Sequence, residues 1–348
     1  MTNLLLSNPY VEDILHQPEA IKDTLSALAC SGVENLSRFA QPLRSGTLRR
    51  VVLTGMGSSY HALHPLHYAL LEQGFHTQMI ETSELIHYAR RLISPDALLV
   101  VVSQSGNSAE VLRLLEQVQG IPLIGITNTS DSPLASKAEA VMLTRAGPEH
   151  TVSCKTYVTA LVALSVLGKL LTGEGPQPVI SDLLTLPDAV AQYLSRLRTH
   201  VDALQQRLAG VQYLMLAGRG PSLAAAETGG LIIKEAAHFP AEGMSSAAFR
   251  HGPIELVSTE VFVLVYDGGR STSALNTDLI TDIQNAESRS ALVTTALDGD
   301  VFHLPPVPVV GLPVLEILPA QVLSLALALM RGHTPGDFVQ ASKVTSIE

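Results

Sequence analysis

Apolar residues come in short runs along the chain, and each run ends at a turn rich in glycine or serine. The clearest runs lie within residues 49–54, 97–102, 121–127 and 213–217, and a helical stretch follows each turn. Short, continuously apolar strands that alternate with helices are typical of parallel sheets covered on both faces. The pattern therefore predicts an α/β protein with doubly wound parallel sheets.

The second half of the chain repeats the pattern of the first at a fixed distance. Gly55 and Gly218 lie 163 residues apart (218 − 55), and Gly106 and Gly269 are separated by the same 163 residues (269 − 106). A constant offset between equivalent turns indicates a duplicated unit. We therefore expect two tandem domains of one ancestry, each a flavodoxin-like three-layer αβα sandwich.

The same pattern sets the domain boundaries that we expect. Residues 1–45 carry apolar positions at helical spacing and predict N-terminal helices. The two domains then cover residues 46–180 and 181–331, and residues 332–348 form an irregular C-terminal tail.

Composition excludes several classes of protein. A hydrophobic share of 46% with 16% charged residues predicts a large core, and a net charge of −10 argues against nonspecific binding to nucleic acid. Cys30 and Cys154 give no disulfide framework. No signal peptide is expected at the N-terminus, and the longest apolar stretch, Val322 to Met330, is too short to span a bilayer. We expect a soluble cytoplasmic protein without a membrane partner.

The loop from Ser103 to Ser108 is the first candidate for chemistry. Three serines, a glutamine and a glycine stand between a predicted strand and a helix N-terminus, where hydroxyls, free backbone N–H groups and the helix dipole favour an anion. The loop has no lysine, so it is not the P-loop of nucleotide-binding proteins. Serines at this place also merely cap helices. The neighbouring turn from Gly55 to Ser59 favours a phosphate site over capping alone.

These motifs, taken together, resemble a known family. Ser103-Gln104-Ser105-Gly106, preceded by Gly57-Ser58-Ser59 and followed by Arg250-His251-Gly252-Pro253, is similar to the sugar isomerase (SIS) family. The similarity is greatest to the isomerase half of glucosamine-6-phosphate synthase and to related phosphosugar isomerases, deaminases and deglycases. It implies two SIS domains, usually in a homodimer.

The resemblance also implies a role for individual positions. The substrate phosphate would be held by Ser59, Ser103, Gln104, Ser105 and Ser108. The sugar would be lined by Gly57, Ser58, Thr151, Ser153 and Ser342. Catalysis would fall to Glu235, His251 and Lys343, with His251 lent by the neighbouring subunit.

Elementary chemistry is compatible with these three catalytic assignments. A carboxylate at Glu235 can move a proton between two carbons if burial raises its pKa towards neutrality; the alternative is that it only pairs with a nearby cation. His251 titrates near neutral pH and can exchange a proton with a ring oxygen. Lys343, close to the terminus, would ordinarily be a solvated charge, and only the resemblance makes it a catalytic candidate.

Other reactive side chains predict no further site. His61, His64 and His67 recur every three residues, but no carboxylate or cysteine joins them at ligand spacing, so we expect no metal. Cys154 has no local histidine partner that would make it a nucleophile. No organic cofactor is expected either.

Three positions depart from the synthase pattern. Thr2 stands where the synthase carries the cysteine of its glutamine-hydrolysing domain, so we expect no such domain and no net amination. Ile232 replaces a lysine and Ala248 a glutamate that relatives often carry. Both changes remove charge and favour deglycases or deaminases over the synthase reaction.

We therefore expect an enzyme that isomerises a hexose 6-phosphate or amino-sugar 6-phosphate, or removes its amine, through an open-chain intermediate. The alternative is a phosphosugar sensor, because SIS domains also occur in regulators. Residues 1–45 are too short and too acidic for a DNA-binding domain, and a sensor has no need of proton-transfer groups.

Overall fold

The computed structural model describes residues 7–30, 33–269, 271–286, 288–295, 299–340 and 343. Its strands form two parallel sheets, as the apolar runs predict. Sheet A has the order β2-β1-β3-β4-β5, formed by β1 (Arg50–Gly55), β2 (Thr77–Glu81), β3 (Ala97–Val102), β4 (Leu123–Thr127) and β5 (Ala140–Leu143). Sheet B has the order β7-β6-β8-β9, formed by β6 (Tyr213–Gly218), β7 (Ala241–Ser245), β8 (Val261–Tyr266) and β9 (Arg289–Val293). Sheet A thus has the strand order of flavodoxin-like proteins.

The first four strands of the two sheets follow one another at nearly the same spacing. The starts of β6, β7, β8 and β9 lie 163, 164, 164 and 166 residues after those of β1, β2, β3 and β4 (213 − 50, 241 − 77, 261 − 97, 289 − 123). Gly106 and Gly269 also share a left-handed backbone, with φ of +60° and +57°. The offset read from the glycines therefore extends through the strands.

The chain divides into two compact units. The sheet-A unit comprises Glu19–Glu149, Lys155–Leu184 and Ala341–Glu348, and the sheet-B unit comprises Met1–Pro18, His150–Cys154 and Thr185–Gln340. The domain boundaries expected from the sequence, at residues 46, 181 and 332, stay predictions.

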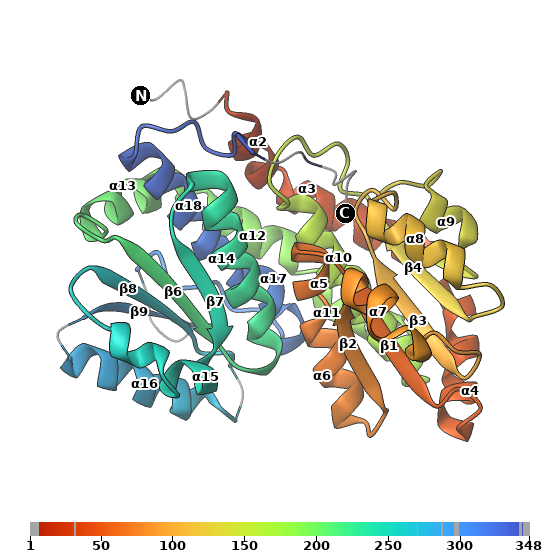
Figure 1. Ribbon diagram of the computed structural model, residues 1–348. Helices are drawn as coiled ribbons and strands as arrows, with labels where there is room; N and C mark the ends of the chain where they lie inside the picture. Colours follow the sequence, from red (N-terminus) through yellow and green to blue (C-terminus); the bar gives the residue numbers. More distant parts are fainter. Residues whose placement is uncertain are drawn as a thin grey trace. The chain divides into compact units, whose positions relative to one another are not determined.

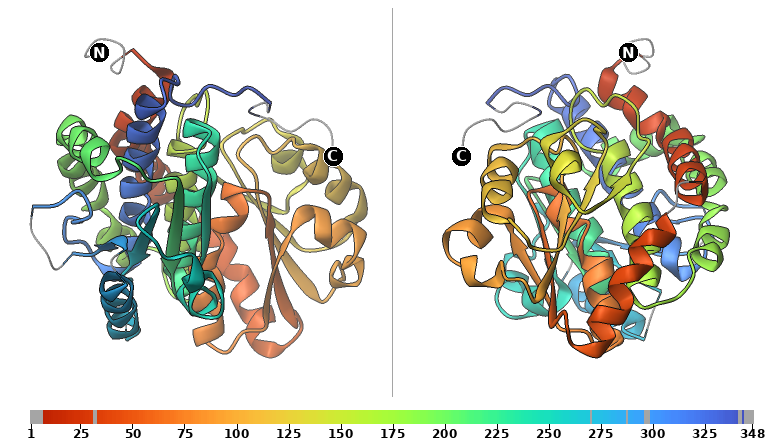
Figure 2. Two further views of the ribbon diagram at one scale, coloured as in Figure 1. Left: turned by 60° about the vertical axis from the view of Figure 1, so that its left-hand side comes forward. Right: turned by 90° about the vertical axis from the view of Figure 1, so that its right-hand side faces the viewer.

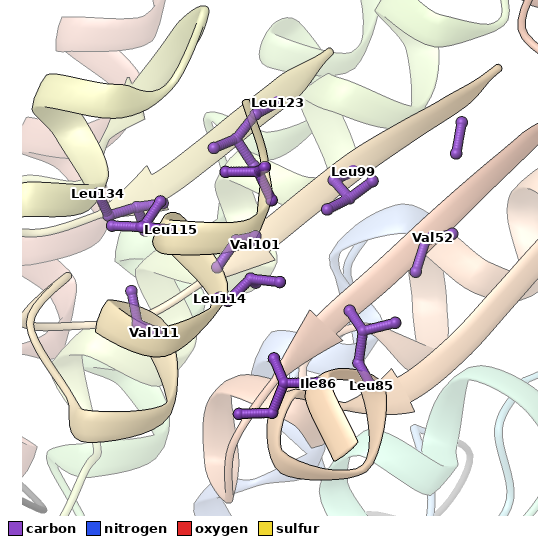
Figure 3. Close-up of a cluster of buried hydrophobic side chains, with 12 residues drawn as sticks. Val52, Leu85, Ile86, Leu99, Val101, Val111, Leu114, Leu115, Leu123 and Leu134 are labelled. Carbon is purple, nitrogen blue, oxygen red and sulfur yellow. The ribbon is translucent and has the colours of Figure 1, made fainter. Parts of the chain in front are cut away.

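Helices cover both faces of sheet A (Figures 1 and 2). One face carries α7 (Thr82–His87), α8 (Ala109–Gln117) and α9 (Pro133–Lys137), whose apolar side chains meet those of the strands (Figure 3). The other face carries α5 (Ser58–His61), α6 (His64–Glu72) and α10 (Lys155–Leu171). The unit also contains α3 (Gln17–Cys30), α4 (Ala40–Ser45) and α11 (Gln177–Leu183). Every residue of β3 is buried, which explains its uninterrupted apolar sequence.

Sheet B is covered in the same way. One face packs against α15 (Ser246–Arg250) and α16 (Ser273–Asn285), and the other against α14 (Leu223–Ala237), which contacts α18 (Leu318–Met330). The unit also contains α2 (Pro9–Leu15), α12 (Leu186–Leu194), α13 (Leu197–Arg207) and α17 (Leu312–Glu316). Gly230 and Gly243 let α14 lie directly on β7 (Figure 1), because a Cβ on Gly230 would be 2.7 Å from the Gly243 nitrogen.

The helical stretch Val309–Met330 is longer than the apolar run read from the sequence. By length and composition these 22 residues could cross a membrane, since an 18-residue window within them has a mean hydropathy of 1.9, but 94% of that window is buried within the protein. Burial explains its composition, so we interpret it as a core helix.

Candidate active site

The loop between β3 and α8 is built by its own serines. The Gly106 N–H donates to Ser103 Oγ (3.1 Å), and the Asn107 N–H donates to Ser105 Oγ (3.2 Å). Ser108 is the N-cap of α8, where its hydroxyl accepts from the Val111 N–H (3.5 Å). A serine that accepts a backbone hydrogen bond still has its own O–H to donate. Capping and anion binding are therefore compatible at these serines.

The loop is also tied to the ends of neighbouring elements. The carbonyl of Gln104 accepts from Thr127 Oγ1 (3.1 Å) and from the Asn128 N–H (3.0 Å), both at the end of β4. The Gly106 carbonyl accepts from the Leu134 N–H (3.2 Å) in α9. These bonds fix the backbone without any ligand, so little ordering is left for an anion to impose.

Gly57, Ser58 and Ser59 lie at the same edge of sheet A. The pairing of β1 with β3 brings Gly55 opposite the end of β3, and a Cβ on Gly55 would be 2.9 Å from the Val102 carbonyl oxygen. Gly57 has a φ of +51°, and Ser58 and Ser59 begin α5. The structure thus brings the two predicted phosphate loops to adjacent strand ends, where parallel sheets bind ligands.

The catalytic candidate Lys343 lies in the same unit, beside an acidic residue that the sequence did not single out. Lys343 Nζ is 2.5 Å from Glu149 Oε2, and the Glu149 side chain is fully buried. Thr156 in the first turn of α10 donates to the same carboxylate from its N–H (3.0 Å) and from Oγ1 (2.7 Å). Glu149 therefore joins the start of α10 to the C-terminal lysine.

The sugar-lining candidates in the segment before α10 and in the tail differ in burial. The Thr151 hydroxyl is buried, and a Cβ on Gly336 would lie 2.9 Å from it. Ser153 is half-buried, and Ser342 lies outside the described residues. Lys155, close to this segment, donates from Nζ to the Pro148 carbonyl (2.6 Å).

Glu235 and His251 lie at opposite ends of β7. Glu235 is half-buried near the C-terminal end of α14, which returns to the start of β7 at Ala241. His251 is exposed in the turn after α15, which begins as β7 ends at Ser245. Four steps of about 3.3 Å separate the ends of such a strand by about 13 Å. The two residues thus belong to elements at opposite ends of this strand.

The positions that depart from the synthase pattern differ in burial. Ile232, one turn before Glu235, is fully buried in the core of the sheet-B unit, whereas Ala248 is exposed on α15. An aliphatic side chain at 232 is thus explained by packing, and nothing in the structure explains Ala248.

The histidines on α5 and α6 are the sequence's one candidate for a metal site. No group of three or more His, Cys, Asp or Glu residues there is arranged to hold a metal ion. His61 ends α5 and His64 begins α6, so the two do not share one continuous helix. His67 Nδ1 forms a hydrogen bond with Thr77 Oγ1 (2.5 Å). The pKa of His67 is lowered mainly by burial and, to a smaller extent, by the nearby His64.

The stretch from just before β1 into α10 decides the family. The model of the SIS domain family matches residues 48–170, which contain both loops and the Glu149 segment. Residues 48–170 form a SIS domain. The resemblance read from the serine motifs is confirmed for this part of the chain.

Comparisons over the whole length extend the likeness beyond the SIS domain. A glutamine–fructose-6-phosphate aminotransferase [isomerizing] of Pyrococcus horikoshii is 29% identical over 353 residues, covering 97% of this chain and 57% of that protein. The chain thus spans a little over half the length of this relative.

Two solved structures share the fold. The tagatose-6-phosphate ketose/aldose isomerase of Escherichia coli has a TM-score of 0.80 at 21% identity, with 97% of each chain covered. The glucosamine-6-phosphate deaminase of Thermotoga maritima has a TM-score of 0.74 at 19% identity, covering 97% of this chain and all of that one (100%).

Proposed function

We propose that the chain is an enzyme that acts on a hexose 6-phosphate or an amino-sugar 6-phosphate in its open-chain form. The observation that carries the proposal is the pre-formed serine loop at the carboxyl end of β3, inside a SIS domain. The relatives support the enzymatic kind, because their names describe isomerisation, amino transfer and deamination of sugar phosphates.

The phosphate would be bound by neutral donors. Ser59, Ser103, Gln104, Ser105 and Ser108 offer hydroxyl, amide and backbone N–H groups at the start of α5 and α8. The chain carries a net charge of −10, so a local set of donors is what would retain an anion. The sugar would extend from this phosphate past Gly57, Ser58, Thr151 and Ser153, with Ser342 in the tail.

The chemistry would lie with Glu235, His251 and Lys343. His251 would transfer the ring-oxygen proton, and Glu235 would then take a proton from one of C1 and C2 and return it to the other. Lys343 would meet the carbonyl or amine end of the open chain. Where an amine leaves, water would add to the imine carbon and the C–N bond would break, so that the products are a free amine and a ketose phosphate for an amine on C2, or an aldose phosphate for an amine on C1. None of these steps calls for a metal or an organic cofactor.

We propose that two copies of the chain complete each site. His251 is exposed and stands at the opposite end of β7 from Glu235, which supports a role for His251 in the site of a neighbouring copy. The nearly constant strand offset further supports the sheet-B unit as a second SIS domain.

Isomerisation and amine loss remain two branches of one proposal. The aliphatic Ile232 supports amine loss, since no lysine stands one turn before Glu235 to hold an incoming amine. We propose the cytoplasm as the compartment, which is supported by Cys30 and Cys154, two cysteines that form no disulfide, and by the buried Val309–Met330 helix.

Mass spectrometry of sugar phosphates incubated with the protein tests the proposal. Glucosamine 6-phosphate, fructose 6-phosphate and fructosamine-type 6-phosphates would be followed for isomerisation and amine release. Glu235→Gln should abolish turnover, whereas Glu255→Gln, an exposed charge in the turn after His251, should not. Tight binding without turnover, unchanged by Glu235→Gln, would instead indicate a sensor.

A further inference from the structure

His238 ends α14 in a conformation that histidine seldom adopts. Its φ of +49° places it in the left-handed region, and it is the sole non-glycine residue with a positive φ in the described part of the chain. Glycine is the common residue at this cap, and outliers of this kind cluster at functional sites. A glycine would satisfy the helix end, so the histidine side chain itself needs an explanation.

The His238 side chain binds a segment from the far end of the sequence. His238 Nε2 lies 3.0 Å from the Asp337 carbonyl oxygen, to which it donates, and its ring lies 5.2 Å from that of His333. The Gly336 N–H donates to the Ala236 carbonyl (3.1 Å) on the last turn of α14. Residues 331–337, here called the strap, are thus held to the end of the helix that carries Glu235.

Further contacts hold both ends of the strap within the sheet-B unit. The Arg331 guanidinium lies 5.7 Å from the centre of the Phe239 ring, next to His238 in sequence. Asn8 Nδ2 donates to the Pro335 carbonyl (3.0 Å). Gly336 has a φ of +82°, and a Cβ there would lie 2.7 Å from Tyr10 Cβ. These contacts therefore fix the position of the strap on the sheet-B unit.

The strap leads directly to Lys343. Lys343 follows Asp337 by six positions in the sequence, a span of at most about 20 Å of extended chain. We propose that His238 is a positioning residue, which seats the strap and so limits where Lys343 can reach. The consequence for catalysis rests on the proposed function, while the seating of the strap does not.

Limited trypsin digestion tests the seating without any substrate. The His238→Gly change removes the ring but keeps a residue suited to the left-handed cap, so the fold should keep its thermal midpoint or gain slightly. Loss of one hydrogen bond and one ring contact should raise the rate of cleavage after Arg331 about tenfold. His333→Ala should raise it by a smaller factor.

His16→Ala is the matched control, because His16 also stands at a helix C-cap and bonds a backbone carbonyl, but that carbonyl belongs to its own helix (Glu12 O, 2.8 Å) and not to the strap. Its cleavage rate after Arg331 should equal that of the wild type. An equal rate in His238→Gly would overturn the proposal.

Steady-state kinetics, with a sugar phosphate that the wild type converts, test whether the position of the strap affects catalysis. His238→Gly should lower kcat about tenfold, or about 1.4 kcal/mol, while the Kd for the sugar phosphate stays within twofold. Faster cleavage with an unchanged kcat would overturn the positioning role. Absence of turnover in the wild type would refute the proposed function alone, since the cleavage rates would still decide whether His238 seats the strap.

Discussion

Replacing Gly106 by alanine should damage the serine loop in two separable ways. Gly106 has a φ of +60°, a region that costs an L-residue about 1–2 kcal/mol. An added Cβ would also lie 2.7 Å from Ser132 Cβ and 3.1 Å from Leu134 Cβ, and it would press on the Ser132 hydroxyl. Overpacking of this kind costs about 1–3 kcal/mol. The expected loss in the free energy of unfolding is thus about 2–5 kcal/mol.

Gly120 provides the matched control, shortly after the C-terminal end of the same helix. Its φ is +71°, and nothing lies within 4 Å of an added Cβ. Gly120→Ala should therefore cost only the conformational term of about 1–2 kcal/mol. The difference between the two variants isolates the clash with α9.

Urea denaturation followed by circular dichroism measures both losses, and calorimetric titration with fructose 6-phosphate measures the site. Gly106→Ala should lower the affinity for the sugar phosphate at least tenfold, because relief of the clash displaces the hydroxyls on either side of Gly106. Gly120→Ala should bind normally. Equal destabilisation of the two variants, or normal binding by Gly106→Ala, would refute the packing argument.

Two further predictions concern buried ionisable groups. Burial lowers the pKa of His200 to about 4, so the folded protein keeps this ring neutral while the unfolded chain protonates it below about 6.5. Between pH 6.5 and pH 4 the free energy of unfolding should therefore fall by on the order of 3 kcal/mol, while above pH 6.5 it should not depend on His200. His200→Phe should flatten that part of a stability-versus-pH curve, and an unchanged slope would contradict the assignment. Glu149→Gln should lower kcat about 10- to 100-fold, because a hydrogen bond to a charged group contributes about 1.5–3 kcal/mol. The Kd for the sugar phosphate should stay unchanged. A wild-type kcat would show that the Glu149–Lys343 pair has no role in catalysis.

The apolar runs predicted the inner strands well and missed two edge strands. Each residue of β3 and β4 is buried, and their sequences are almost entirely apolar. In contrast, β2 and β7 are half-exposed, and their sequences, Thr77–Glu81 and Ala241–Ser245, show no apolar run. Gly243 argues against a strand by propensity, yet the close approach of α14 requires it. Only the packed fold reveals that reason.

The serine loops could be located from sequence because they depend on local order: strand, turn, helix. Glu149 could not, since one acidic residue after a Gly-Pro pair is typical of an exposed turn, and its burial depends on α10 and the distant Lys343. The roles of Glu235 and His251 stay predictions, and the structure places the two residues on elements at opposite ends of β7.

The affinity of one variant for two ligands tests the central claim, that the serine loop binds the phosphate of a sugar. Fructose 6-phosphate and fructose would each be titrated calorimetrically into the wild type, into Ser105→Ala, and into Ser26→Ala, an exposed serine remote from the loop in sequence. Ser105→Ala should lower the affinity for fructose 6-phosphate about tenfold, as expected for a lost hydrogen bond to a charged group, and should leave the affinity for fructose unchanged. Equal effects on both sugars, or none on the phosphate, would contradict the account.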